Sequence, residues 1–235
     1  MHTARDPRFP ALGVAVDVVV FTVRDGQLEV LLTRRPDEEP FPGAWSLPGG
    51  FVRPDESADD AAARELAEKA GVEDVFLEQL YTFSAPDRDP RSRVVAVAYY
   101  ALVSADKAAL GARADGRTRA PQWFRVQAES EEHAQAFLPG QPPVTLAFDH
   151  DEILRTAVQR IRGKLEYVPI GFQLLPPHFT LTELQSVYEA VLGHPVDKRN
   201  FRSKIQKSGL VRESDAVKKG PHRPAKLFEF TQRTF

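Results

Sequence analysis

The stretch that decides the fold is residues 50–72, which read GFVRPDESADDAAARELAEKAGV. A loop that contains glycine and carboxylates leads here into a run of strong helix formers. Ser57, followed three residues later by Asp60, predicts the start of a helix over residues 58–70, and Gly71 stands where this helix should stop. The sequence therefore predicts a loop and a helix that carry charged side chains at set intervals.

The same stretch resembles the Nudix box. In that pattern a glycine and a glutamate are separated by five residues, and an arginine-glutamate pair follows after seven more, ahead of two adjacent glutamates and a glycine. Every one of these positions matches except the second of the adjacent glutamates, which is Lys69 here. Residues 42–50 (PGAWSLPGG) also resemble the family's approach to the box. The box positions of this chain are Gly50, Glu56, Arg64, Glu65, Glu68, Lys69 and Gly71.

The resemblance implies a pyrophosphate-cleaving chemistry in which carboxylates of this loop and helix hold Mg²⁺ against phosphates. Such a metal takes oxygen ligands and polarises the phosphoryl group. Lys69 places a positive charge at one ligand position, where it would repel a bound cation. Two like unit charges about 4 Å apart repel by roughly 4 kcal/mol at an effective dielectric of about 20. Glu65 and Lys69 are also in the favourable order for an ion pair within the helix. We therefore expect weak or no hydrolysis and no required cofactor, with only weak residual Mg²⁺ binding at Glu65 and Glu68.

Apolar and β-branched runs on both sides of the box predict strands. Residues 14–23 and 28–34 are joined by a glycine-containing turn, and residues 93–103 and 122–126 follow later in the chain. From residue 148 to residue 167, apolar side chains recur at helical spacing. Together with the box, this order predicts a mixed α/β fold, the Nudix α/β/α sandwich.

A ligand pocket should survive the change at position 69. Residues 81–93 resemble the corresponding segment of Nudix proteins of the ADP-ribose type. Arginine forks suit phosphate oxygens, and aromatic rings can stack on a base or a ribose. We predict ADP-ribose or a related nucleotide as the effector. The candidate effector-binding residues are Arg34, Arg35, Trp45, Phe51, Arg88, Arg91, Arg93 and Tyr99.

The charge of the chain is divided unevenly. Residues 1–169 hold 20 Lys and Arg against 27 Asp and Glu, a balance of −7, whereas residues 170–235 hold 11 against 6, a balance of +5. An excess of positive charge over so short a segment indicates a polyanionic partner. The chain has no cysteine, which suits a reducing compartment. Since no signal or membrane-span pattern is present, we expect a cytoplasmic protein without a membrane partner.

The basic C-terminal segment has the pattern of a DNA-binding module. After two prolines at 176–177, apolar spacing predicts a helix that ends at Gly193. Asp197 is a suitable N-cap for a second helix from residue 198 to about residue 208, with Phe201 and Ile205 as its buried stripe.

Polar and basic side chains fall away from that stripe, which is typical of a recognition helix that contacts base edges and phosphates. A β pair formed by residues 210–213 and 226–230 should follow, with a basic connecting loop that can touch the DNA backbone. The predicted DNA contacts are Lys198, Arg199, Asn200, Arg202, Ser203, Gln206 and Lys207 on the helix, and Lys218, Lys219, His222 and Arg223 in the loop.

The order of a Nudix domain, two helices and a basic hairpin resembles the NrtR family, Nudix-related regulators of NAD-metabolism genes, and residues 197–202 (DKRNFR) look like its recognition-helix segment. The resemblance implies a homodimer on a palindromic operator in double-stranded DNA and an ADP-ribose-type effector. We predict a sensing domain at residues 1–147, a linker helix packed on it at 148–169, and a winged helix-turn-helix domain at 170–235. The predicted function is a transcription regulator, a repressor of NAD or related nucleotide or sugar metabolism genes.

Two other functions stay open on the residues alone. One is a working ADP-ribose pyrophosphatase whose C-terminal extension serves only dimerisation or substrate specificity. Such an enzyme would need a replacement carboxylate, for which Glu129, Glu131 and Glu132 are candidates. The other is a nucleotide-sensing module that binds a protein and no DNA.

Overall fold

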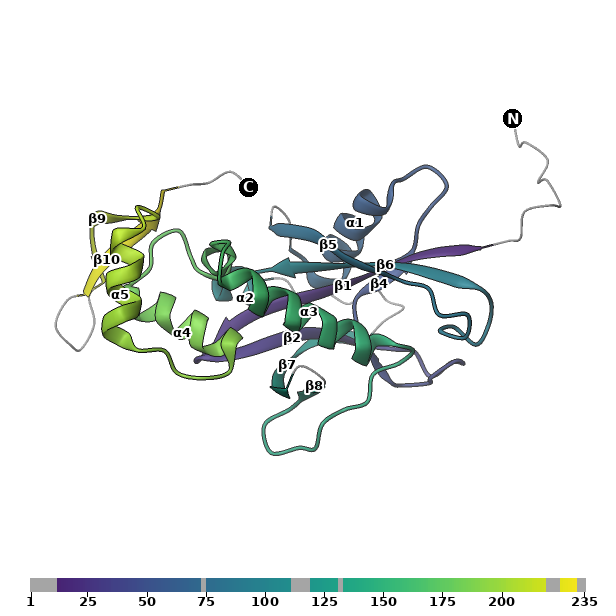
Figure 1. Cartoon of the computed structure of the whole chain (residues 1–235). Coiled ribbons are helices and arrows are strands. Elements are labelled where there is room, and N and C mark those ends of the chain that lie inside the picture. Colours follow the sequence, from purple (N-terminus) through teal and green to yellow (C-terminus); the bar gives the residue numbers. More distant parts are fainter. Residues whose placement is uncertain (1–11, 73–74, 111–118, 131–132, 219–224, 232–235) are drawn as a thin grey trace.

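The structure of the chain is a computed structural model that describes residues 12–72, 75–110, 119–130, 133–218 and 225–231 (Figure 1). An eight-stranded sheet forms the body of the molecule, in the order β5-β6-β1-β2-β7-β8, with β3 on β2 and β4 on β1. Its strands are β1 (Gly13–Arg24), β2 (Gln27–Arg34), β3 (Trp45–Ser46), β4 (Gly49–Phe51), β5 (Phe76–Phe83), β6 (Val94–Leu102), β7 (Arg119–Ser130) and β8 (His133–Phe137).

Helices cover both faces of this sheet. Helix α1 (Ala58–Ala70) packs on one face and α3 (His150–Leu165) packs on the other (Figure 1). The short α2 (Ala105–Leu110) and the 3₁₀ helix η1 (Ile170–Leu174) lie toward the same end of the sheet as the C-terminal elements. The three-layer α/β/α arrangement expected from the sequence is therefore confirmed.

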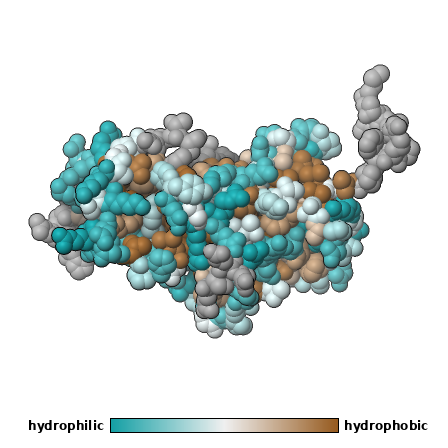
Figure 2. Space-filling model, viewed as in Figure 1, coloured by the Kyte–Doolittle hydropathy of each residue, from teal (hydrophilic) through white to brown (hydrophobic). Residues whose placement is uncertain are grey.

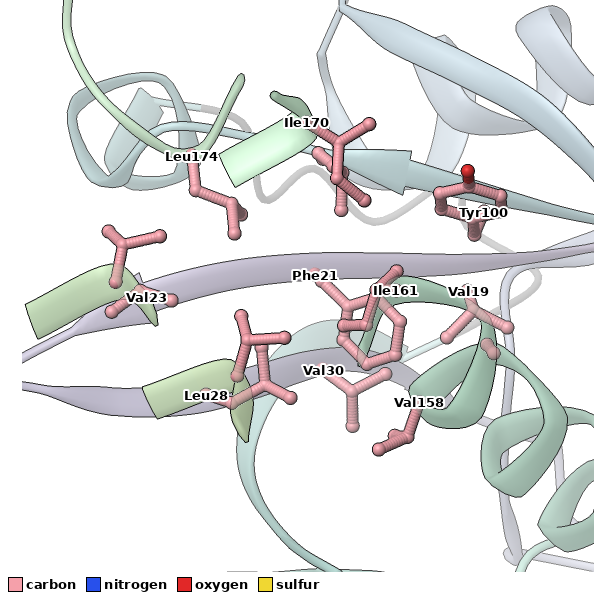
Figure 3. Packing of buried hydrophobic residues seen from close by; sticks show 14 of the residues in the cluster. Val19, Phe21, Val23, Leu28, Val30, Tyr100, Val158, Ile161, Ile170 and Leu174 are labelled. Carbon is pink, nitrogen blue, oxygen red and sulfur yellow. The ribbon is translucent and has the colours of Figure 1, made fainter. Parts of the chain in front are cut away.

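Strand β1 is the centre of both cores because its side chains alternate between the two faces. Val16 and Val18 pack with α1, whereas Val19 and Phe21 pack on the side of α3 and η1, as Figure 3 shows for the latter pair. Such a doubly buried strand has a continuous apolar run in its sequence. This explains why the segment could be recognised as a strand.

Helix α1 begins and ends as predicted. The Ser57 hydroxyl accepts a hydrogen bond from the Asp60 N–H at 3.1 Å, and the Asp60 carboxylate accepts one from the Ser57 N–H at 3.2 Å. Gly71 has a φ of 62°, a left-handed conformation that favours glycine, and its N–H donates to the Ala67 carbonyl. These caps set where the charged side chains of the box begin and end.

The C-terminal module consists of α4 (Leu181–Leu192), α5 (Lys198–Lys207), β9 (Val211–Lys218) and β10 (Ala225–Phe230). Phe201 and Ile205 are buried, as predicted, and Phe201 contacts Tyr188 of α4 edge to face. The antiparallel β pair is confirmed, although β9 extends five residues beyond the predicted end at residue 213. The predicted basic loop lies mostly outside the described residues, which resume at residue 225.

One hydrophobic cluster runs through both parts of the chain. It contains Phe21 of the large sheet, Ile161 of α3, Leu184 of α4 and Phe201 of α5. Arg162 of α3 also donates to the Val191 carbonyl of α4 at 2.8 Å. The C-terminal module is thus packed against the sheet domain through the contacts of α4 with β2, α3 and η1. Among the described residues, no helix is long and apolar enough to cross a membrane.

The sequence analysis did not predict β5. Its side chains do not alternate regularly between buried and exposed, and a bulge interrupts its pairing with β6 between Gln79 and Tyr81. A bulge shifts the two-residue periodicity by which strands are recognised. The loop that follows β5 carries the predicted arginines, so this strand positions part of the site.

Candidate functional site

A cavity of about 240 Å³ lies beside β1 and β4, where the loop after β5 and the start of α3 come together. The glycines of β4 form one wall. A Cβ atom on Gly49 would stand 2.4 Å from the Val16 carbonyl oxygen, so only glycine fits against β1 there. The charged and aromatic lining residues are Asp17, Arg35, Phe51, Lys69, Arg88, Asp89, Arg91, Phe148 and His150.

Arg88 is buried and held by two carboxylates. Its guanidinium donates to Asp149 through Nε at 2.8 Å and Nη2 at 2.6 Å, and Nη2 also lies 3.2 Å from Asp17 Oδ2. Burial acts to lower the pKa of Arg88, but the hydrogen bonds and charges of Asp149 and Asp17 raise it overall. Asp149 precedes α3, so this fork joins the loop after β5 to the start of that helix.

The buried carboxylate of Asp17 also faces His150. Nε2 of His150 lies 3.4 Å from Asp17 Oδ1, while Nδ1 accepts a hydrogen bond from the Leu47 N–H at 3.0 Å. This assigns the ring proton of the neutral imidazole to Nε2, facing the carboxylate. Burial acts to raise the pKa of Asp17, but His150 and Arg88 together hold it below its ordinary value. Asp17 is therefore a buried, negatively charged residue in the wall of the cavity.

Two further arginines flank an aromatic ring beside the cavity. The guanidinium of Arg35 lies 4.8 Å from the centre of the Phe148 ring, and that of Arg91 lies 5.7 Å from it. Arg91 is bound by both oxygens of Asp89. Burial and the charge of Arg91 lower the pKa of Arg35. Phe148 has a φ of 58°, which is strained for a bulky residue, and strained residues of this kind cluster at functional sites.

The Nudix-box residues form a connected ionic network. Arg64 binds Glu56 through Nε at 2.9 Å and Nη2 at 2.6 Å, and its Nη1 lies 2.6 Å from Glu65 Oε1. Gly50 packs against the same carboxylate, because a Cβ on it would stand 2.2 Å from Glu65 Oε1. The arginine therefore joins the loop to the helix.

Lys69 forms the predicted ion pair. Its Nζ lies 2.9 Å from Glu65 Oε2 and also donates to the Gly49 carbonyl. Glu68, by contrast, is 46% exposed and makes only long ionic contacts, at 3.6 Å with Arg64 and 3.7 Å with Arg53. The two glutamates that could have kept a weak metal site thus face different surroundings. In the described part of the chain, no three His, Asp or Glu side chains are grouped to hold a metal ion.

Glu56 should contribute to stability in a pH-dependent way. Hydrogen bonds from Arg64 and from the Arg53 N–H lower its pKa to about 2, below the value of about 4.3 for an unfolded chain. A lowered pKa stabilises the fold above the unfolded value, and this contribution is lost as the pH falls through the folded value. We expect Glu56→Gln to lower the Tm at neutral pH, with the difference from the parent shrinking between about pH 4.3 and 2.

Thermal unfolding at a series of pH values checks this expectation. Glu152→Gln is the matched control, since that side chain is 60% exposed and lies 3.9 Å from its arginine partner. It should leave the Tm nearly unchanged at every pH. A difference between Glu56→Gln and the parent that stays constant down to the lowest pH would contradict the role given to Glu56.

The structure brings four of the eight predicted effector-binding residues to the cavity. These four are Arg35, Phe51, Arg88 and Arg91. Phe51 is 52% exposed, so its ring is available to a ligand. Arg88 lines the cavity but donates to Asp149 and Asp17, so it is a structural part of the wall, and its contact with a phosphate stays a prediction.

The other four predicted residues do not line this cavity. Arg34 donates to the Gly43 carbonyl, and Arg93 donates to the carbonyls of Ser84 and Ala85. The expectation that Trp45 and Tyr99 stack on a ligand is corrected for the cavity, because both rings are engaged in packing. Trp45 meets Phe124 at 4.7 Å, and Tyr99 is 3% exposed with its hydroxyl bound to Asp59.

The sequence analysis missed several residues of the cavity. Asp17 had a visible signal, because it is the only charged residue in the largely apolar run of residues 14–23 and a buried carboxylate needs partners. Asp89, Phe148 and His150 had none, since each lies in a polar or mixed segment and reaches the cavity only through tertiary packing. Of the alternative carboxylates, Glu131 and Glu132 lie outside the described residues.

Helix α5 presents a polar and basic face on the C-terminal module. Asp197 caps it by accepting from the Asn200 N–H at 2.8 Å. Arg202 is half buried and donates to Thr182 of α4 at 2.9 Å, while Ser203 is also half buried. The exposed members of the predicted set are Lys198, Arg199, Asn200, Gln206 and Lys207.

The expected wing adds little to the described surface. Lys219, His222 and Arg223 lie outside the described residues, as does the side chain of Lys218. On the face drawn in Figure 2, hydrophilic residues cover much of the end formed by α5 and the β9-β10 pair. The structure describes every residue of α5, whereas the DNA contacts of the loop stay a prediction.

Known families match both parts of the chain. Residues 12–146 match the Nudix domain, and residues 171–230 match the NrtR DNA-binding winged helix domain. The class is thus a Nudix domain joined to a winged helix. The chain is 36% identical over 230 residues to the ADPR-responsive transcriptional repressor NtrR of Acinetobacter baylyi, and the aligned region covers 97% of this chain and 85% of that protein. The chain belongs to the NrtR family of Nudix-related regulators.

Solved structures agree with this assignment. NrtR of Shewanella oneidensis in complex with a 27mer DNA superimposes with a TM-score of 0.77 at 33% identity, and the match covers 93% of each chain. The Nudix domain of the same protein in complex with ADP ribose gives a TM-score of 0.54 at 35% identity, over 67% of this chain and 94% of that one. The predicted fold, a Nudix sandwich followed by a winged helix, is confirmed.

Proposed function

We propose that this chain is a transcriptional repressor that binds double-stranded DNA through α5 and is controlled by ADP-ribose, or a similar nucleotide, in the Nudix cavity. The observation that carries the proposal is the combination, in one packed chain, of a cavity lined by arginines and phenylalanines with a capped helix that exposes basic and amide side chains. The 36% identity of the chain to an ADPR-responsive repressor supports both the DNA binding and the control by a nucleotide.

The cavity suits a diphosphate linked to ribose. Arg35, Arg91 and Lys69 provide positive charge, while Phe51 and Phe148 provide apolar rings for a base or a sugar. At about 240 Å³ the cavity is below the range of about 300–1,000 Å³ that is typical of sites enclosing a whole small-molecule ligand. The diphosphate and one ribose therefore occupy it, and the base lies on the rings at its mouth.

Helix α3 supplies the physical connection between the cavity and the DNA-binding module. Its first residue, His150, lines the cavity, and Arg162 near its other end donates to Val191 of α4 and Ala128 of β7. A ligand that shifts the start of this helix also moves the element on which α4 rests. Such a rigid element couples two sites if it has two arrangements.

The Nudix domain of this chain serves as a sensor and hydrolyses little or nothing, because Lys69 occupies a ligand position and pairs with Glu65. No cofactor is required, and Mg²⁺ matters only to residual activity. The DNA site is a palindromic operator bound by a homodimer, since a twofold protein reads two equivalent half-sites. The regulated genes belong to NAD or related metabolism, and the protein acts in the cytoplasm.

Fluorescence anisotropy with DNA from the region upstream of its own gene tests the proposal. We expect salt-dependent binding that ADP-ribose weakens, because the two ligands favour different arrangements. Thermodynamic linkage requires that the same DNA weaken ADP-ribose binding by the same factor. If ADP-ribose leaves DNA binding unchanged, its proposed role as the effector is refuted. Robust turnover of ADP-ribose with Mg²⁺ would favour the pyrophosphatase alternative.

A further inference from the structure

The ammonium group of Lys69 occupies a position between oxygens of two elements. It donates to the carbonyl of Gly49 in β4 and lies 2.9 Å from a carboxylate oxygen of Glu65 in α1. The lysine also lines the cavity, although only 15% of its side chain is exposed. Carbonyl and carboxylate oxygens are the ligands that a hard divalent cation takes in proteins. A side-chain cation makes these contacts here.

The residues at this position do not fit a magnesium ion. An ion bound to Glu65 Oε2 would meet the lysine ammonium, and like charges at such a distance repel strongly. The other oxygen of Glu65 is occupied by Arg64 at 2.6 Å. Glu68 points to the surface and supplies no replacement ligand. Both carboxylate oxygens of Glu65 are thus already paired with side-chain cations, and Glu68 is not available as a second ligand.

The charges of the box also balance without a metal. Arg64 and Lys69 carry two positive charges, and Glu56 and Glu65 carry two negative charges, all within one ionic network. With glutamate in place of Lys69, the same four positions would carry a charge of −2. One divalent cation neutralises that charge. The lysine does so within the chain.

We propose that Lys69 serves as a built-in cation that binds the diphosphate of the effector, so that effector binding by this chain is independent of divalent metal. This inference rests on the proposed function, because it concerns the same cavity and the same class of ligand. A lysine ammonium has three donors. One of them is used in the hydrogen bond to the Gly49 carbonyl, and the contact with Glu65 is an ion pair, so that a donor is left for a phosphate oxygen in the cavity.

The position of Lys69 is set before the ligand arrives. Its stem is packed in a mostly buried site, and its head is held from two sides. A cation that is already ordered loses little conformational entropy when it binds an anion. Arg35, which directly follows β2, lines the same cavity, so an anionic ligand there meets the positive charges of both Lys69 and Arg35.

Isothermal titration calorimetry of the full chain with ADP-ribose, in excess EDTA and in millimolar Mg²⁺, tests the proposal without any substitution. We expect the two dissociation constants to agree within about twofold. Binding that requires Mg²⁺ would overturn the role of Lys69 and leave the proposed function intact. Absence of binding in both buffers would instead overturn the proposed function, and this inference with it.

Two substitutions sharpen the test, with the non-cleavable α,β-methylene analogue of ADP-ribose as the probe. Lys69→Met keeps an unbranched side chain of nearly the same length and removes its charge, so it should weaken binding about tenfold or more, as expected for the loss of a charge-assisted hydrogen bond. Lys69→Glu should bind weakly in EDTA and recover when Mg²⁺ is added. Equal affinity of Lys69→Met and the parent would overturn the proposal.

Lys107→Met is the matched control. It removes one lysine charge from α2, which is not among the elements that line the cavity, and it should bind the analogue as the parent does. Thermal unfolding without ligand verifies that each variant is folded. If Lys69→Met does not fold, the comparison of EDTA with Mg²⁺ on the parent decides the question.

Discussion

Arg88→Ala should lower the free energy of unfolding by about 3–5 kcal/mol, the range observed when one partner of a buried ion pair is removed. The guanidinium is almost fully buried and binds Asp149 with two donors while contacting Asp17. Without it, two carboxylates stay in a poorly solvated site with less compensation, and His150 alone faces Asp17. The loss should appear as a lower midpoint in urea unfolding monitored by circular dichroism.

Arg155→Ala is the matched control for this prediction. It removes an arginine from the surface of α3 whose ionic partner, Glu152, lies 3.9 Å away and is 60% exposed. Exposed pairs of this kind contribute about 0–1 kcal/mol. Adding Asp149→Asn to Arg88→Ala should recover part of the loss, because one unpaired charge is removed. A loss below about 1 kcal/mol for Arg88→Ala would show that Asp17 and Asp149 are solvated without it.

Replacing Arg199 and Lys207 together with alanine should weaken operator binding about a hundredfold. Both side chains are exposed on the face of α5 opposite the buried stripe of Phe201 and Ile205. A direct base contact contributes about 1–3 kcal/mol, and a phosphate contact adds salt-dependent affinity. The slope of log affinity against log salt should become shallower by about one for each phosphate contact removed. Anisotropy at several salt concentrations measures both effects.

Lys204→Ala separates these contacts from the general charge of the helix. It removes a positive charge from the same helix, but Lys204 lies beside the groove formed with Leu165 and Tyr167 at the end of α3. We expect this variant to bind DNA nearly as the parent does. Equal weakening by Lys204→Ala and by either member of the double variant would refute a specific DNA-facing surface on α5.

Arg202 requires a different interpretation from Arg199. Both belong to the predicted DNA-binding set, but Arg202 donates to Thr182 and is half buried between α5 and α4. Its replacement would disturb the packing of the two helices as well as any contact with DNA. Arg199 is therefore the better residue on which to test DNA recognition.

Much of the fold could be predicted because local signals agreed with one another. The two-sided apolar run of β1, the capping box at Ser57 and Asp60, and the N-cap at Asp197 each appear in the structure where the sequence placed them. Edge strand β5 could not be predicted, because a bulge interrupts its alternation. The wing residues 219–224 stay a prediction.

By itself, the sequence determined the Nudix box with its single exchange at Lys69, the capped basic helix α5 and the order of the two modules. These are properties of residue type and spacing, which short-range geometry converts directly into helices, caps and charged faces. Only the tertiary structure decided which side chains share the cavity. Arg88 and Asp149 are 61 residues apart and meet where the loop after β5 reaches the start of α3, while Tyr99 and Trp45 pack against other side chains. The physical reason is that burial and ion pairing depend on which surfaces meet, and no local pattern records that.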